Sequence, residues 1–204
     1  MGLRNTKPSA KSTEHLENNA VEKKKRKSII LLRRESTFNP ANKSISDFDV
    51  AATPPVITDL QRDILVESFS TLKLHISQIG VLLFMGLFET HPQIQGFFGN
   101  FKDCPPENLP ESKELRQHAL RVMGFVEKCI SRIYMTDKLD AIIKELGERH
   151  ASYGAPSEFF PFVGPQFICA IRLSLQMKWD DETENAWLAL FTYIAHGMKQ
   201  AAAI

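Results

Sequence analysis

Two histidines, His118 and His150, stand at positions where amphipathic helices would place apolar side chains. His118 falls on a stripe of apolar residues that recur every three or four positions from Leu115 to Ile133. His150 continues a second stripe of this kind, which begins at Leu139. Burying an imidazole costs free energy unless a partner compensates, so a pair on core-facing stripes predicts a shared partner. A metal ion or a metal-containing cofactor between two facing helices would satisfy both rings.

Each histidine taken alone is more often a hydrogen-bonded core residue than a ligand, and only the pair favours ligation. The other four histidines lack a matching partner on a facing stripe. We expect them to be solvated or locally bonded; they are His15, His75, His91 and His196.

The chain from Thr58 onward is predicted to be all-α, because helical periodicity recurs and no alternating strand pattern does. Thr58 and Gln61 have the form of a capping box, and Asp181 and Glu184 form another. Pro110 is expected to open the helix that carries His118. Further expected boundaries are a cap at Thr136, a stop at Gly154 and a helix over about 158–178, which Pro161 and Pro165 would delay or kink.

Length and charge divide the chain into two parts. The 204 residues suffice for one domain with a tail, so we assign 1–57 to a disordered extension and 58–204 to the helical domain. Residues 1–57 hold 11 Lys or Arg against 6 Asp or Glu, and the remainder holds 14 against 18. The net negative charge of the body argues against binding to nucleic acid. The net positive charge of the tail favours binding to an anionic surface. No secretory signal is expected, and the dense apolar run 80–88 is about half of a membrane span.

Five stretches in order resemble the globin family, and the likeness covers 58 to about 200. They include the helix and proline of 80–92, the paired phenylalanines of 97–101, and the histidine helices of 115–122 and 146–150. The surrounding sequence resembles globin X and neuroglobin-like six-coordinate globins more than myoglobin. This resemblance implies a three-on-three helical sandwich of about eight helices that binds haem b.

The resemblance also assigns roles within the haem site. His150 would be the proximal iron ligand, bonded to the carbonyl of Leu146, and His118 the distal residue. The other residues implied to contact haem are Phe84 and Val122 above it, Phe98 and Phe101 at the corner, Arg121 at a propionate, and Phe160 and Val163 on the opposite side.

In six-coordinate relatives the distal histidine itself ligates iron, which favours redox chemistry or sensing of oxygen, nitric oxide or nitrite over bulk transport. An unidentified reductase would then supply electrons. An oxygen store and a haem-free membrane-recruited scaffold are the alternatives, and the presence of His150 argues against the scaffold. Cys104 lies where some neuroglobins carry a regulatory disulfide, but three reduced cysteines, with Cys129 and Cys169 buried, are the preferred interpretation.

The N-terminus carries two membrane signals. Gly2 and Thr6 fit the N-myristoylation pattern, although Leu3 replaces the palmitoylated cysteine typical of fish globin X. Residues 21–34 hold seven basic residues against one acid: Lys23, Lys24, Lys25, Arg26, Lys27, Arg33 and Arg34. We expect attachment to anionic lipid at the cytoplasmic face of a membrane, such as the plasma membrane. A nuclear or cytoplasmic location is the alternative, and phosphorylation of Ser28 or Ser36 would weaken the attachment.

Overall fold

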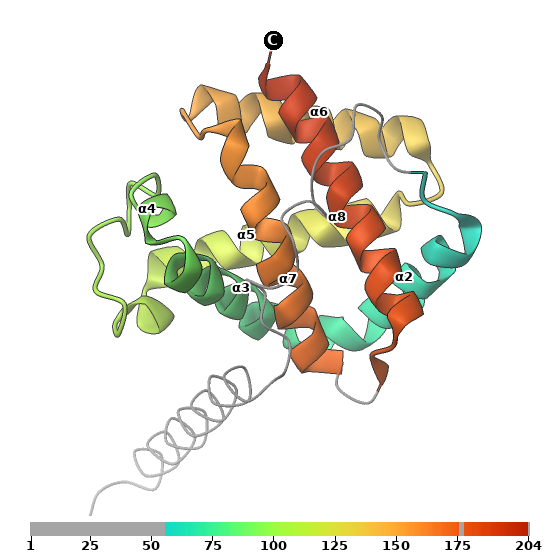
Figure 1. The fold of residues 1–204 in the computed structure, drawn as a ribbon, viewed down its shortest axis with the longest axis horizontal. Helices are drawn as coiled ribbons and strands as arrows, with labels where there is room; N and C mark the ends of the chain where they lie inside the picture. The colour runs from blue at the N-terminus through green and yellow to red at the C-terminus, as the bar shows by residue number, and fades with distance from the viewer. Residues whose placement is uncertain (1–55, 176–177, 204) are drawn as a thin grey trace, which may run out of the picture. The chain divides into compact units, whose positions relative to one another are not determined.

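The computed structural model describes residues 56–175 and 178–203. Within them the chain is helical and contains no strand, which confirms the predicted all-α body (Figure 1). The helices are α2 (Asp59–Leu72), α3 (Ile76–Thr90), α4 (Pro92–Gln95), α5 (Lys113–Ser131), α6 (Thr136–Ser152), α7 (Phe160–Leu175) and α8 (Asp181–Ala202). Short 3₁₀ turns lie over Lys73–His75, Leu109–Glu111 and Ser157–Phe159. The predicted boundary at residue 57 lies at the edge of the described range and stays a prediction.

Local hydrogen bonds set most helix ends, and they confirm some predicted caps and correct others. The Thr58 hydroxyl accepts from the Gln61 backbone N–H while the Gln61 side chain accepts from that of Thr58, so the predicted capping box is present. The cap predicted at Thr136 is wrong, because Thr136 is already the first helical residue and Met135 precedes it without a side-chain cap. Asp180, rather than Asp181, caps α8 by accepting from Thr183.

The start of α5 and the end of α6, the two histidine helices, are set by different signals. α5 begins at Lys113 with Ser112 as its N-cap, because Pro110 lies in a preceding 3₁₀ turn instead of opening the helix. α6 ends at Ser152, and Gly154 stops it, as predicted, with a φ of 72° that glycine adopts without strain. The backbone N–H of Ala155 donates to the carbonyl of His150, which gives this end a Schellman cap.

The helix predicted over about 158–178 is present as α7, but Pro161 and Pro165 do not delay its start, because both lie within it. α7 begins at Phe160 and contains Pro165 in its interior, where one backbone donor is missing. Its residues pack with α8 around Trp187 and Phe167, which are among the largest fully buried side chains. Trp187 also donates its indole N–H to the Ser68 hydroxyl of α2 at 3.0 Å.

A glycine lets each histidine helix cross a neighbouring helix at close range. A Cβ on Gly80 of α3 would lie 2.9 Å from Cβ of Ala119 on α5, next to His118. A Cβ on Gly147 of α6 would lie 2.6 Å from the carbonyl oxygen of Met198 on α8. These distances are shorter than a methyl group tolerates, so the crossings require glycine. They fix α5 against α3 and α6 against α8.

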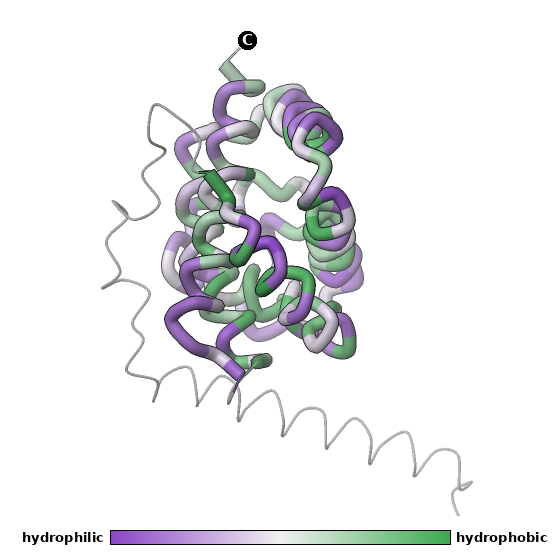
Figure 2. The backbone as a smooth tube through the Cα atoms, turned by 90° about the vertical axis from the view of Figure 1, so that its right-hand side faces the viewer, coloured by the Kyte–Doolittle hydropathy of each residue, from purple (hydrophilic) through white to green (hydrophobic). Residues whose placement is uncertain are grey.

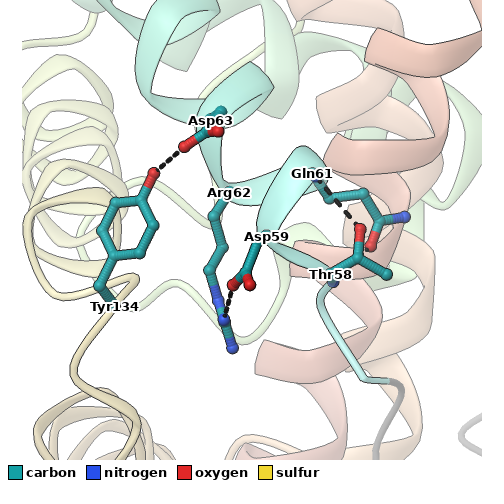
Figure 3. A network of polar contacts seen from close by, with 6 residues as sticks. All are labelled: Thr58, Asp59, Gln61, Arg62, Asp63 and Tyr134. Carbon is teal, nitrogen blue, oxygen red and sulfur yellow. Dashed lines mark hydrogen bonds and ion pairs between the residues drawn. The ribbon is translucent and has the colours of Figure 1, made fainter.

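Polar contacts hold the start of α2 against the turn between α5 and α6 (Figure 3). The Tyr134 hydroxyl donates to Asp63, and Arg62 pairs with Asp59 at 2.5 Å. By length and composition alone the described stretch Asp59–Thr90 would be apolar enough to cross a membrane. In the structure a 3₁₀ turn interrupts this stretch, and core residues such as Leu65 and Leu83 lie buried in it. Figure 2 shows apolar and polar residues alternating along the helices, as amphipathic packing requires.

Candidate functional site

His150 is held by its own helix and by the first residue of α7. Its Nδ1 lies 2.9 Å from the carbonyl oxygen of Leu146, one turn earlier on α6, which agrees with the predicted bond. The ring of Phe160 meets the imidazole edge-on, with centroids 5.7 Å apart. A neutral imidazole that donates through Nδ1 keeps its lone pair on Nε2. The bond to Leu146 therefore orients the ring as in a metal-ligating histidine.

His118 lies inside an aromatic cage made by α3 and the segment after α4. The rings of Phe84 and Phe98 meet it nearly perpendicular, at centroid distances of 5.0 and 5.1 Å, and Phe101 lies at 6.3 Å. Phe98 and Phe101 stack on each other at 5.0 Å. These rings exclude water from much of the imidazole and restrict the positions that it can take.

The electrostatics of the site keep His118 neutral. Burial is the largest cause that lowers its pKa, to about 4, and the charges of Arg121 and His150 lower it further. His150 contributes because the two imidazoles are close enough to interact. Nη2 of Arg121, an exposed residue, lies 3.5 Å from Nδ1 of His118. The arrangement therefore places a neutral His118 among aromatic rings, with the Arg121 cation beside it.

Comparison with known proteins identifies this arrangement. The family model described as "Globin" matches residues 81–198, more than half of the chain. The chain belongs to the globin family. Haem is therefore its cofactor, and the resemblance seen in the sequence is confirmed, as is the globin fold.

Individual relatives of this globin are distant in sequence. It is 24% identical to neuroglobin-2 of Oncorhynchus mykiss over 71% of this chain and 91% of the relative. It is 27% identical to an anaerobic nitrite reductase of Gossypium hirsutum over 65% of this chain and 82% of the relative. A solved structure of a hexacoordinated heme protein from an anhydrobiotic tardigrade superposes with a TM-score of 0.69, at 18% identity over 72% of this chain and 96% of that one.

The described residues fit a haem in this globin. Haem needs an axial nitrogen ligand within an apolar slot, and the bond from His150 to Leu146 with the rings around His118 meets both needs. Val122 follows His118 by one turn and is half-buried, as is Val163 one turn after the buried Phe160. The haem contacts assigned to individual residues stay predictions.

Two residues of the distal region were missed by sequence reasoning. Phe88 packs against Phe84, Phe98 and Phe101 at 5.8, 5.4 and 6.1 Å, and its spacing of four residues from Phe84 was the available signal. The side-chain amide of Gln95 donates hydrogen bonds to three loop carbonyls, and no sequence pattern predicts such contacts.

Predictions were also made for the cysteines, the other histidines and the N-terminal sites. Cys129 and Cys169 are buried as expected, and Cys104 and Cys129 carry free thiols. His91 is locally bonded to Thr90 and His75 is exposed, as expected. His196 is buried on α8, so of its two expected states only local bonding stays a prediction. Gly2, Ser28, Ser36 and the basic residues of 23–34 lie outside the described residues, and so does His15.

Proposed function

We propose that both His150 and His118 bind the haem iron of this globin, which then works in redox chemistry or ligand sensing. The observation that carries the proposal is the confinement of His118 among Phe84 and Phe98, where burial lowers its pKa to about 4. Bound haem supplies an iron centre that exchanges one electron and binds small ligands such as oxygen, nitric oxide or nitrite.

The protein side chains decide how that centre is used. His150 would hold the iron through Nε2, because its Nδ1 is committed to the Leu146 carbonyl. The cage of Phe84, Phe98 and Phe101 excludes water from much of the His118 imidazole and restricts its positions, so His118 would supply the second ligand. An external ligand must wait until His118 withdraws, so its affinity falls by the fraction of protein in which His118 is bound. This penalty suits a sensor or an electron-transfer protein better than an oxygen carrier.

The names of the relatives support a role in redox chemistry or sensing. One relative is a neuroglobin, another is a nitrite reductase, and the tardigrade structure is titled hexacoordinated. Arg121 adds a cation beside His118 that would attract an anion such as nitrite or a haem propionate. Turnover of nitrite would require electrons from a reductase partner.

We predict that the purified ferrous protein has a six-coordinate, low-spin absorption spectrum. Replacing His118 with alanine should convert it to a five-coordinate, high-spin form and raise the rate of carbon monoxide binding at least on the order of tenfold, because no internal ligand competes. His75→Ala is the matched control, since His75 is exposed on a 3₁₀ turn. A high-spin ferrous spectrum in the parent would contradict the proposal and favour oxygen storage.

We further propose that the N-terminus attaches this globin to the cytoplasmic face of an anionic membrane. A myristoyl group on Gly2 would give only marginal binding, and the basic residues between Lys23 and Arg34 would add about 1 kcal/mol each near anionic lipid. The two signals together make stable attachment.

Vesicle sedimentation of the full chain, produced with an N-myristoyltransferase, tests the attachment. Binding to vesicles that contain phosphatidylserine should fall on the order of 100-fold when Lys23, Lys24 and Lys25 are replaced with glutamine. Gly2→Ala should weaken binding to neutral and anionic vesicles alike. Equal binding of the parent and both variants would contradict the membrane proposal and leave the haem chemistry unaffected.

A further inference from the structure

Gln95 ties the segment after α4 back to that helix. It is the last residue of α4, is half-buried, and its Nε2 lies 3.0 Å from the carbonyl oxygen of Phe101, 3.2 Å from that of Lys102 and 2.9 Å from that of Cys104. An amide nitrogen has two hydrogens, so three carbonyls share two donors. One side chain therefore gathers the carbonyls of a turn up to nine residues away.

The same segment also borders open space. An open cavity of about 560 Å³ lies there, lined by residues 99–104 and, across from them, by Asn108, Glu111, Ser112 and Glu114. The segment thus has room to move toward the start of α5. Among the described residues, the amide of Gln95 is the side chain that bonds its backbone to α4.

This segment carries part of the cage around the distal histidine. Phe98 begins it and Phe101 lies within it, and both rings pack on His118. The carbonyl of Phe101 is itself one of the three acceptors of Gln95. Any displacement of the segment would therefore move two of the three rings that restrict His118.

We propose that Gln95 is a positioning residue for the distal pocket, whose amide latches the segment 98–104 and thereby closes the cage on His118. Release of the latch frees His118 to withdraw and speeds the entry of an external ligand. The effect on ligand entry rests on the proposed coordination of iron by His118, whereas the latch itself does not.

Gln95→Glu is the sharpest test, because it keeps the shape of the side chain, removes both donors and faces a carboxylate toward three carbonyl oxygens. Gln93→Glu is its matched control, with the same charge change on the same helix at an exposed position. In stopped-flow mixing of the full-length ferrous protein with saturating carbon monoxide, the rate limited by His118 should rise on the order of tenfold in Gln95→Glu only. Gln95→Lys, which restores three donors, should return the rate toward that of the parent.

A second measurement follows the latch without reference to the haem. Cys104 contributes the third acceptor and has a half-buried thiol, whereas Cys129 and Cys169 are buried. The reaction of Cys104 with a disulfide reagent should therefore be several-fold faster in Gln95→Glu than in Gln93→Glu. Equal thiol reactivity in the two variants overturns the latch. Faster thiol reaction with an unchanged ligand rate, in a six-coordinate parent, overturns its control of His118.

A five-coordinate ferrous spectrum in the parent would instead remove the proposed function, and with it the predicted effect on ligand entry. In that case the reactivity of Cys104 still decides whether Gln95 holds the segment. The two failures are therefore distinguishable.

Discussion

Replacing His150 with alanine is expected to yield a helical protein that purifies almost without haem. His150 is the residue whose Nδ1 is committed to a backbone carbonyl, so its Nε2 is the lone pair oriented for iron. Loss of an outer-shell partner already costs 10- to 100-fold in affinity for a metal, and loss of the ligand itself should cost more. The ratio of Soret to protein absorbance in the purified full chain measures the effect.

Two controls separate a lost ligand from a damaged fold. His150→Gly leaves a space that free imidazole can enter, so added imidazole should restore a Soret band to that variant. His75→Ala removes an exposed histidine and should keep the full haem content. A His150→Ala protein with the Soret band of the parent would show that another residue anchors the haem.

The features that sequence reasoning predicted are those controlled by short-range spacing. Apolar residues three and four apart located the two histidine helices, and the bond that the globin resemblance implied from His150 to Leu146 joins residues one turn apart on one helix. The capping box at Thr58 is likewise local. Within the distal region, Phe84 and Phe98 were identified by their order in a globin-like pattern, and the structure brings their rings onto His118.

The caps that were predicted wrongly show where local pattern stops being sufficient. Asp180 and Asp181 are both residues that favour a cap, and the backbone conformation, extended at Asp180, decides between them. Thr136 has a suitable side chain, but the turn from α5 into α6 makes it the first helical residue instead. In both cases the tertiary path of the chain chose among candidates that sequence could not separate.

Contacts between distant elements were out of reach for a different reason. The amide of Gln95 meets carbonyls that are up to nine residues away, through a loop without periodicity. The low pKa of His118 requires knowing that Arg121 and His150 lie near a buried ring. The glycine crossings require knowing which helix lies opposite, and spacing along one helix carries no such information.

Among these crossings, that of Gly147 leads to the second large expected effect. Gly147→Ala should lower the melting temperature by several degrees and accelerate haem loss. The added methyl would lie 2.6 Å from the Met198 carbonyl oxygen and 2.8 Å from Cβ of Ala201, so α6 must shift away from α8. Such overpacking costs roughly 1–3 kcal/mol, partly offset by about 1 kcal/mol from the better helix propensity of alanine. Scanning calorimetry and haem transfer to an excess of an apoglobin measure the two effects.

The matched control is Gly124→Ala on α5, where an added Cβ meets no atom within 4 Å. That variant gains helix propensity without a clash, so its melting temperature should rise by about 2–4 °C. The two substitutions are chemically identical and both lie inside helices that carry a histidine. Opposite signs would therefore isolate the effect of the crossing from the effect of alanine itself.

The rate of haem loss from Gly147→Ala tests whether the packing of α6 on α8 affects the haem site. Gly147 lies one turn before His150, so a displaced α6 carries the imidazole and its Leu146 partner with it. A variant that melts earlier but keeps haem as firmly as the parent would show that the site tolerates movement of α6. A variant that melts later, as Gly124→Ala should, would contradict the close packing of α6 on α8. Loss of both stability and haem would show that the crossing of two helices, rather than the histidine alone, determines how the iron is held.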